Sequence, residues 1–180
     1  EEEQTLEDEE QMKYLAENDF YFPTWEQVEN YIDGKQELPE KSIVITVDDG
    51  DPSFFELAVP IIQKYKIPTT SFVITYWYGN RANDKQDYVS YQSHSYDMHK
   101  AGSNGKGVML SWDYDKIKDD ILLSRDVLGG ANIFCYPFGQ YNDLDIKVLK
   151  ENGYRLAFTT KGGKVKKGSS KYELPRVRIS

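Results

Sequence analysis

Short apolar runs alternate with amphipathic helical patterns along most of this 180-residue chain, and that alternation restricts the fold more than any other feature. Runs rich in β-branched and aromatic residues predict strands at 43–47, 70–75, 88–92, 132–136 and 154–159. Apolar residues at helical spacing predict helices at 25–32, 54–65, 112–128 and 143–151. Strands that alternate with helices predict a parallel sheet or barrel, in which functional groups gather at the C-terminal ends of the strands.

Capping and breaking residues define the expected limits of several elements. Thr24 and Ser111 are suitable N-caps, because a hydroxyl can accept a hydrogen bond from a free N–H of the first turn. Pro60 should kink or shorten the helix over 54–65, since proline has no backbone N–H. The continuous β-branched run at 43–47 predicts a strand that is buried on both faces.

The acidic residues are unevenly distributed. The chain has 22 Lys and Arg against 30 Asp and Glu, a formal net charge of −8. Residues 1–10 hold seven of the acids and no base, so the remainder is nearly neutral. A block of like charge predicts a poorly ordered tail at 1–10, followed by one domain over 11–180. The acidic balance argues against nucleic acid or an acidic membrane as a partner.

The chain contains one cysteine, Cys135, which excludes an internal disulfide framework. No apolar run approaches the length of a transmembrane helix, and no secretory signal is recognisable. Because the first residue is Glu and not Met, we expect that an export signal or anchor has been removed.

Two adjacent carboxylates, Asp48 and Asp49, follow the first predicted strand and precede Gly50. Paired carboxylates at the end of an apolar strand are costly to hold unless a positive charge compensates them. A glycine-assisted turn could direct both side chains toward one pocket. An ordinary turn or helix cap is the simpler interpretation of this motif taken alone.

The two histidines of the chain, His94 and His99, follow another predicted strand. Two imidazoles and a carboxylate form a common three-ligand metal site with open positions. Residues five apart on a regular helix point about 140° away from each other, so a shared ion requires a loop or a π-bulge here. Two surface histidines in a polar loop would satisfy the same spacing.

The third candidate segment, 135–142, reads Cys-Tyr-Pro-Phe-Gly-Gln-Tyr-Asn and follows a further apolar strand. Proline, glycine and aromatic residues here would form a rigid wall at the rim, with backbone N–H groups facing the pocket. The alternative is a plain strand-to-helix turn, since Asn142 is a good N-cap for the next helix.

In this order, the three segments resemble the motifs of the polysaccharide deacetylases of the NodB-homology type, carbohydrate esterase family 4. The first family motif matches Thr-Val-Asp-Asp-Gly at 46–50, the second matches His-Ser and the later His at 94–99, and the third matches Pro-Phe-Gly at 137–139. The five-residue histidine spacing is most similar to the branch that deacetylates poly-β-1,6-N-acetylglucosamine. The resemblance begins near residue 15 and implies an α/β fold, a distorted and incomplete (β/α) barrel.

The resemblance also implies roles for individual residues. Asp49, His94 and His99 would hold one divalent metal ion, with zinc expected first and cobalt, nickel, iron or manganese as alternatives. Asp48 would be the catalytic base, and the backbone N–H of Phe138 would stabilise the oxyanion.

Two departures from the family pattern affect the acid half of the reaction. The chain has no third histidine to protonate the leaving amine. Cys135 occupies the position where the third motif usually has arginine, so the usual ion pair with Asp48 cannot form there. We expect Arg176, in the last segment, to reach the pocket and supply that guanidinium. Cys135 itself is an unsuitable nucleophile, since it lies in an apolar strand pattern and no spare histidine could activate it.

Three aromatic or cyclic side chains, Tyr136, Pro137 and Trp77, are candidates for contact with a sugar. Trp77 and its aromatic neighbours follow a strand end, where they could stack on a sugar ring or simply pack against the protein.

The resemblance predicts hydrolysis of N-acetyl groups from N-acetylglucosamine residues of a cell-surface or biofilm polysaccharide, with release of acetate. A monomer located outside the cell or at its surface is expected. A carbohydrate-binding relative that retains the fold and metal but has lost activity is an alternative. A non-haem iron oxygenase could use the same two-histidine, one-carboxylate set, but the Asp48-Asp49 pair argues against it.

Overall fold

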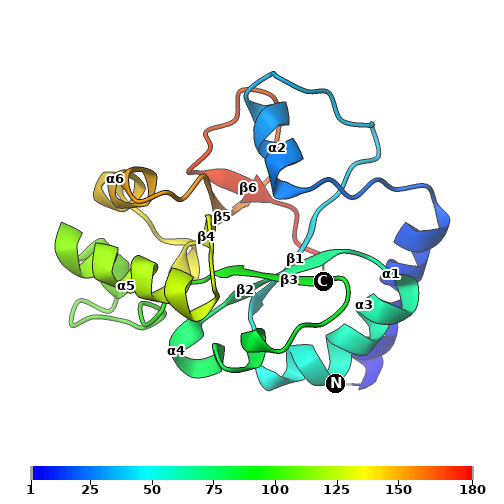
Figure 1. Cartoon of the computed structure of the whole chain (residues 1–180), viewed down its shortest axis with the longest axis horizontal. Coiled ribbons are helices and arrows are strands. Elements are labelled where there is room, and N and C mark those ends of the chain that lie inside the picture. The colour runs from blue at the N-terminus through cyan, green and yellow to red at the C-terminus, as the bar shows by residue number, and fades with distance from the viewer. Residues whose placement is uncertain (1, 180) are drawn as a thin grey trace.

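The computed structural model describes residues 2–179, with side chains from residue 8 onward, and its centre is a six-stranded parallel sheet. The strands pair in the order β1 to β6, so each neighbours the next one along the chain. Their bounds are Ile45–Asp49, Thr69–Val73, Val89–Ser93, Ile133–Cys135, Leu156–Gly162 and Leu174–Arg176. The sheet curls into a distorted, incomplete (β/α) barrel, as predicted (Figure 1).

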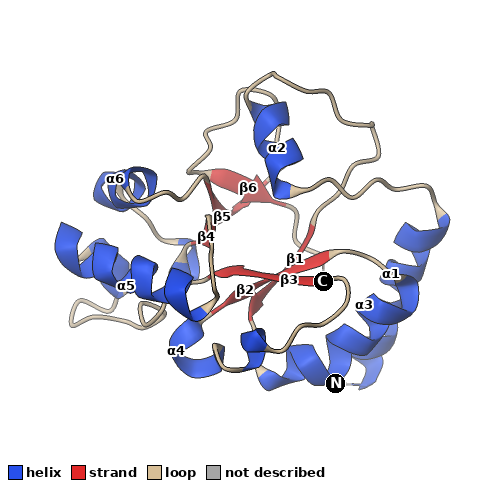
Figure 2. Ribbon diagram, in the orientation of Figure 1, coloured by secondary structure: helices blue, strands red, loops and turns tan. Residues whose placement is uncertain are grey.

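Helices cover the sheet on both sides, as Figure 2 shows. The helices α5 (Tyr114–Val127) and α6 (Asp143–Glu151) pack side by side, while α1 (Glu2–Glu17) and α3 (Val59–Tyr65) pack together elsewhere on the sheet. The remaining helices are α2 (Trp25–Ile32) and the short α4 (Thr75–Tyr78). Among the described residues, none of the helices combines the length and apolar character needed to cross a bilayer.

The interior of the half-barrel is apolar and is covered by α2 (Figure 1). Val28 and Ile32 of α2 pack against inward-facing side chains of the strands, namely Phe72, Ile133, Cys135, Leu156, Phe158 and Leu174. Trp25 adds ring contacts with Phe72 and Phe158. Each fully buried aliphatic or aromatic side chain here stabilises the fold by about 1.5–3 kcal/mol.

Two predicted helix limits are confirmed in detail. Thr24 caps α2 in a capping box with Gln27, whose side chain binds the Thr24 backbone N–H at 2.9 Å. The helix predicted over 54–65 is divided near Pro60, as expected. A π-helical turn covers Phe54–Ala58, and Pro60 then lies in the first turn of α3, where its missing N–H breaks no helical hydrogen bond.

The prediction that Ser111 is the N-cap of the helix over 112–128 is wrong. The α5 helix begins at Tyr114 with Asp113 as its N-cap, and the Asp113 carboxylate accepts the Lys116 N–H at 2.9 Å. Ser111 instead closes a 3₁₀ turn, where its hydroxyl donates to the carbonyl of Val108 at 3.2 Å. A carboxylate is the stronger acceptor at a helix N-terminus because it also favours the helix dipole.

The first strand also differs from its prediction. It runs over 45–49 and not 43–47, so Asp48 and Asp49 are its last two residues and not a following turn. Its residues are half-buried, and the expected burial on both faces is wrong. The reason is position, since β1 is an edge strand with β2 as its one partner in the sheet. The sequence patterns did not predict β6 or α4.

The acidic segment 1–10 was predicted to be a poorly ordered tail, and the structure describes its backbone from residue 2 onward. The described part of this segment belongs to α1, and Glu9 contacts α3. The Glu9 carboxylate lies 2.5 Å from Lys64 Nζ and accepts the Tyr65 hydroxyl at 3.0 Å. These two contacts of Glu9 attach this part of α1 to α3.

Candidate active site

The first part of the site is the end of β1, where the carboxylates of Asp48 and Asp49 both lie within 4.8 Å of a ring nitrogen of His94. Asp49 has φ of 83° and Gly50 has φ of 75°, so two successive residues are in the left-handed region. For the non-glycine residue this costs about 1 kcal/mol or more. A side chain at Gly50 would approach Val73 to 3.0 Å. The left-handed backbone at the end of β1 therefore redirects Asp49, which regular strand geometry would point away from Asp48.

Asp49, His94 and His99 converge on one point. Asp49 Oδ1 lies 3.5 Å from His94 Nε2 and 4.0 Å from His99 Nε2, and the two imidazole rings are 4.8 Å apart. Their ligand atoms all lie within 4.8 Å of one another. Nitrogen and oxygen ligands about 2.0–2.2 Å from a common ion have similar mutual spacings. The three predicted ligands are therefore brought together in a set that fits a divalent metal.

His94 is oriented for ligation by a bond on the far side of its ring. Its Nδ1 lies 2.7 Å from the carbonyl oxygen of Cys135, so the ring N–H belongs there and Nε2 is left to face Asp49. Burial lowers the pKa of His94, and the nearby Asp48 carboxylate only partly opposes that effect. The neutral imidazole, which is the form that binds metal, is thus favoured near pH 7.

Asp48 forms a two-point ion pair with Arg176 of β6. Arg176 Nη1 lies 2.7 Å from Asp48 Oδ1, and Nη2 lies 2.9 Å from Oδ2. Burial acts to raise the pKa of Asp48, but the hydrogen bonds from Arg176 and the neighbouring His94 and Cys135 lower it overall. The structure therefore places Arg176 where the missing family arginine was expected to act, and this contact joins the two edge strands of the sheet.

Cys135 lies beneath this pair. Its Sγ is 3.2 Å from Arg176 Nη2 and 3.8 Å from Asp48 Oδ2. Complete burial, with the adjacent Asp48 charge, raises the pKa of the thiol well above its usual range. A second possible metal set consists of Asp48, His94 and Cys135, whose ligand atoms also lie within 4.8 Å of one another. That second set is less suited to a metal, because its thiol stays protonated and its carboxylate is already paired.

The turn over Pro137–Gly139 forms the wall beside His99. Phe138 has φ of 59°, and its ring centroid lies 4.3 Å from that of His99. A Cβ at Gly139 would lie 2.2 Å from Thr160 Oγ1, so this glycine permits a close contact between the turn and β5. Phe138 is partly exposed at the rim, while Pro137 is buried and fixes the turn.

The predicted contact between Tyr136 and substrate is wrong. Tyr136 is 1% exposed, stacks on Tyr141 and donates its hydroxyl to the carbonyl of Tyr172 at 2.9 Å. It follows Cys135, whose side chain faces the barrel interior, so strand alternation directs Tyr136 into the outer core beneath α6.

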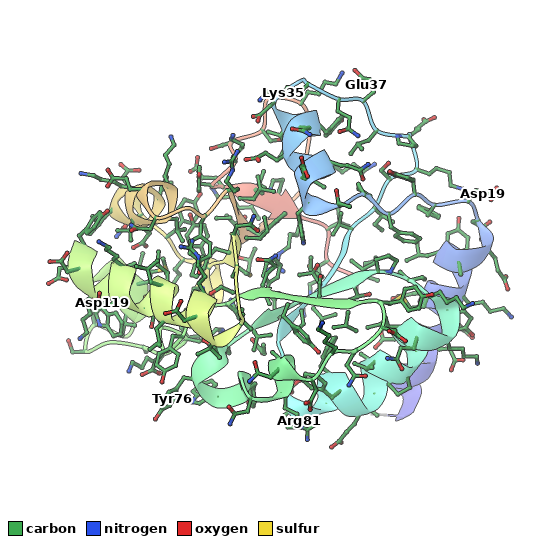
Figure 3. All side chains as sticks on the ribbon, in the orientation of Figure 1. Asp19, Lys35, Glu37, Tyr76, Arg81 and Asp119 are labelled. Carbon is green, nitrogen blue, oxygen red and sulfur yellow. The ribbon has the colours of Figure 1, made fainter. Side chains whose placement is uncertain are left out.

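Trp77 remains available to a ligand. It is 52% exposed on α4, next to the exposed Tyr76, which Figure 3 labels. The N–H groups of Thr75 and Tyr76 donate to the carbonyl groups of Ser95 and Tyr96 at 3.1 and 3.0 Å. The aromatic surface of α4 is therefore attached directly to the loop that carries both histidines.

One buried acid that contacts the histidine loop was missed in the sequence, namely Asp120. This acid lies on the inward stripe of α5 beside Ile117, Ile121 and Ser124, and it is 7% exposed. An acid on the apolar face of a helix was the available signal, because such a group must find buried partners.

Together, a parallel half-barrel with two histidines and two carboxylates at its open end defines a candidate metal-dependent hydrolase centre. The chain belongs to the polysaccharide deacetylase family, whose model matches residues 35–157.

Curated relatives extend this similarity along the chain. The poly-beta-1,6-N-acetyl-D-glucosamine N-deacetylase of Staphylococcus aureus (strain MRSA252) is 29% identical over 191 aligned positions, covering 96% of this chain and 66% of that protein. The protein of the same name from Staphylococcus epidermidis is 28% identical, covering 94% of this chain and 65% of its own length. The chain thus spans slightly less than two thirds of the length of these relatives.

Solved structures support the fold. IcaB from Ammonifex degensii has a TM-score of 0.84 at 24% identity, covering 98% of this chain and 84% of that one. The Streptococcus pyogenes deacetylase PplD, in complex with acetate, has a TM-score of 0.82 at 24% identity, and the match covers 95% of this chain and 79% of that one.

Proposed function

We propose that this chain is a metal-dependent N-deacetylase that removes acetyl groups from N-acetylglucosamine residues of a polysaccharide. The observation that carries the proposal is the convergence of Asp49, His94 and His99 beside a carboxylate, Asp48, that Arg176 keeps ionised. A site that only bound carbohydrate would not need an ionised base next to a metal set.

The chemistry divides between the metal and the chain. A divalent ion, zinc by preference for nitrogen and oxygen ligands, would polarise the acetamide carbonyl and activate water. Cobalt, nickel, iron or manganese would suit the same donors. Asp48 removes the proton of the attacking water, while Arg176 holds its carboxylate in place. The backbone N–H of Phe138 donates to the carbonyl oxygen as negative charge develops on it.

Asp48 also supplies the leaving-group proton in this proposal. Both histidines of the chain belong to the metal set, so neither is free to act as the acid. Water adds its oxygen to the carbonyl carbon, the C–N bond breaks, and the proton taken by Asp48 passes to the departing nitrogen. The products are acetate and a free amine on the sugar.

The substrate proposal rests on the relatives and on α4. The staphylococcal relatives carry names that specify the poly-β-1,6-linked polymer. Exposed Trp77 and Tyr76 beside the histidine loop offer flat faces on which neighbouring sugar rings could stack. We therefore expect a β-1,6-linked N-acetylglucosamine polymer, a site of action outside the cell or at its surface, and a monomeric protein.

The test is acetate release from β-1,6- and β-1,4-linked N-acetylglucosamine oligomers by metal-depleted protein and by the same protein after Zn²⁺ or Co²⁺ is restored. We expect release only with metal, and faster from the β-1,6 oligomers. His99→Ala should remain inactive after metal addition, whereas the exposed Asp115→Asn should behave as wild type. Absence of release from both oligomers under every metal condition would reject the proposed activity.

A further inference from the structure

The segment that carries both histidines is an irregular loop in which every backbone N–H from His94 to Met98 has an acceptor. The N–H of His94 donates to the carbonyl of Val73 at 2.9 Å, which continues the sheet. Ser95 donates to Ser93 Oγ and Met98 to Ser95 Oγ, each at 3.1 Å. Ser95 has φ of 69°, so the loop leaves helical geometry at the point where the histidines must be brought together.

The two central N–H groups of the loop bind one carboxylate. Tyr96 donates to Asp120 Oδ1 and Asp97 donates to Asp120 Oδ2, each at 2.8 Å. Burial raises the pKa of Asp120 to about 6, although these two N–H groups act to lower it. The group is therefore ionised at neutral pH, and each bond is a charge-assisted one. Both carboxylate oxygens are used on the loop that joins the metal ligands.

A second residue of α5 holds the beginning of the same loop. Ser124, one helical turn after Asp120, lies 2.7 Å from Ser93 Oγ and accepts the Thr75 hydroxyl at 3.2 Å. Thr75 in turn donates its N–H to the carbonyl of Ser95 at 3.1 Å. Two positions four residues apart on one helical face thus fix the loop before and after Ser95.

We propose that Asp120 is a positioning residue for the metal site, which holds His94 and His99 at the separation that one ion requires. This inference rests on the proposed metal-dependent function. Five residues separate the histidines, and a regular helix would point them about 140° apart. Without the carboxylate, two backbone N–H groups of the loop would lose their acceptor in a buried place, and the loop would rearrange to satisfy them.

The test compares Asp120→Asn with Asp119→Asn, its exposed neighbour on α5, which is labelled in Figure 3. Two measurements are made on each folded protein: amide hydrogen exchange of Tyr96 and Asp97 without metal, and Co²⁺ affinity by chelator competition with the visible spectrum recorded. Asp120→Asn should exchange these two amides faster than wild type and bind Co²⁺ about 10–100-fold more weakly, with an altered spectrum. Asp119→Asn should match wild type in both.

Wild-type exchange, affinity and spectrum in Asp120→Asn would overturn the inference. Failure of the wild-type protein to bind any divalent metal would reject the proposed function, and the amide exchange would still decide whether Asp120 holds the loop. Should Asp120→Asn not fold, Asp120→Glu keeps the charge and displaces it by one methylene. Its Co²⁺ affinity should then fall severalfold, and unchanged affinity would again overturn the inference.

Discussion

Arg176 contributes to the candidate site mainly through the ionisation of one carboxylate. Asp48 is partly buried, which by itself favours the neutral acid, whereas a base must be charged at the pH of the reaction. The two-point contact from Arg176 reverses that preference and also orients both carboxylate oxygens. One side chain from the last strand thus favours the ionised form of a carboxylate on the first strand, which is the form that the proposed base requires.

Replacing this guanidinium should change both rate and pH dependence. In Arg176→Ala the pKa of Asp48 rises, so the acidic limb of the kcat/KM profile should move to higher pH. At pH 7 we expect a loss of at least about tenfold in kcat/KM. The measurement is acetate release across pH 5–9 with metal present. Arg178→Ala, which removes a neighbouring exposed arginine, should leave the profile unchanged. An unshifted limb in Arg176→Ala would mean that the pair has no catalytic consequence.

The candidate metal ligands and the pairing of Asp48 with Arg176 were predictable from residue type and motif order, while the orientation of nearby side chains was not. Tyr136 was expected at the substrate wall but is buried, because the strand alternates faces and Cys135 occupies the inward position. Asp120 escaped notice because its partners are backbone N–H groups far away in the sequence, which no side-chain pattern records.

At the scale of elements, α6 shows how a capping arrangement can carry an energetic cost. Asn142 caps the helix, and Asp145 completes the capping box by accepting the Asn142 N–H at 3.2 Å. Asp145 is fully buried, and its Oδ1 has no hydrogen-bond partner among the residues that the structure describes. Burial raises the pKa of Asp145 to about 7, so the native state retains a proton that the unfolded chain would release near pH 4.

Asp145 should therefore make stability fall as the pH rises. Between about pH 4 and pH 7 the native state binds more protons than the unfolded state, so the free energy of unfolding decreases with pH and levels off above about pH 8. Asp145→Asn keeps the capping oxygen and removes the buried charge. Its free energy of unfolding at pH 8 should be about 1–2 kcal/mol higher than that of wild type, and should change less with pH. Urea unfolding at a series of pH values measures this. A loss of stability at pH 8, or an unchanged slope, would contradict it. Asp143→Asn, outside the buried face, is the matched control.

Helix and strand alternation predicted the order of the elements well, because periodicity reports which faces are buried. Element ends were less predictable. The α5 helix begins at Tyr114 with Asp113 as its N-cap, since a carboxylate competes better than the Ser111 hydroxyl for the free N–H groups. The strand β6 is three residues long and contains a proline, so it offers no alternating pattern to detect.

At the scale of the whole molecule, the half-barrel is joined across its opening by side chains. Among the described residues, the strand order runs from β1 to β6 without backbone pairing between these two edges. Arg176 instead bridges them through Asp48, and α2 fills the interior beneath. The cluster of Asp49, His94 and His99 lies beside this ion pair and draws on β1 and the loop after β3.

Metal binding should consequently stabilise the whole fold. An ion that binds the native state and not the unfolded chain adds about 2.7 kcal/mol at a concentration 100 times its Kd. Zn²⁺ or Co²⁺ should raise the Tm of metal-free protein by several degrees. The increase should vanish in His99→Ala and persist in Asp115→Asn. An equal increase in His99→Ala would show that the ion binds elsewhere.

The most direct test of the central claim is the activity of Asp48→Asn measured together with its bound metal. The account predicts that this variant binds one divalent ion with near wild-type affinity, because Asp49, His94 and His99 are intact, yet releases acetate at least about 100-fold more slowly. Acetate release at the wild-type rate from the metal-loaded variant would contradict the assignment of Asp48 as the base on which this site depends.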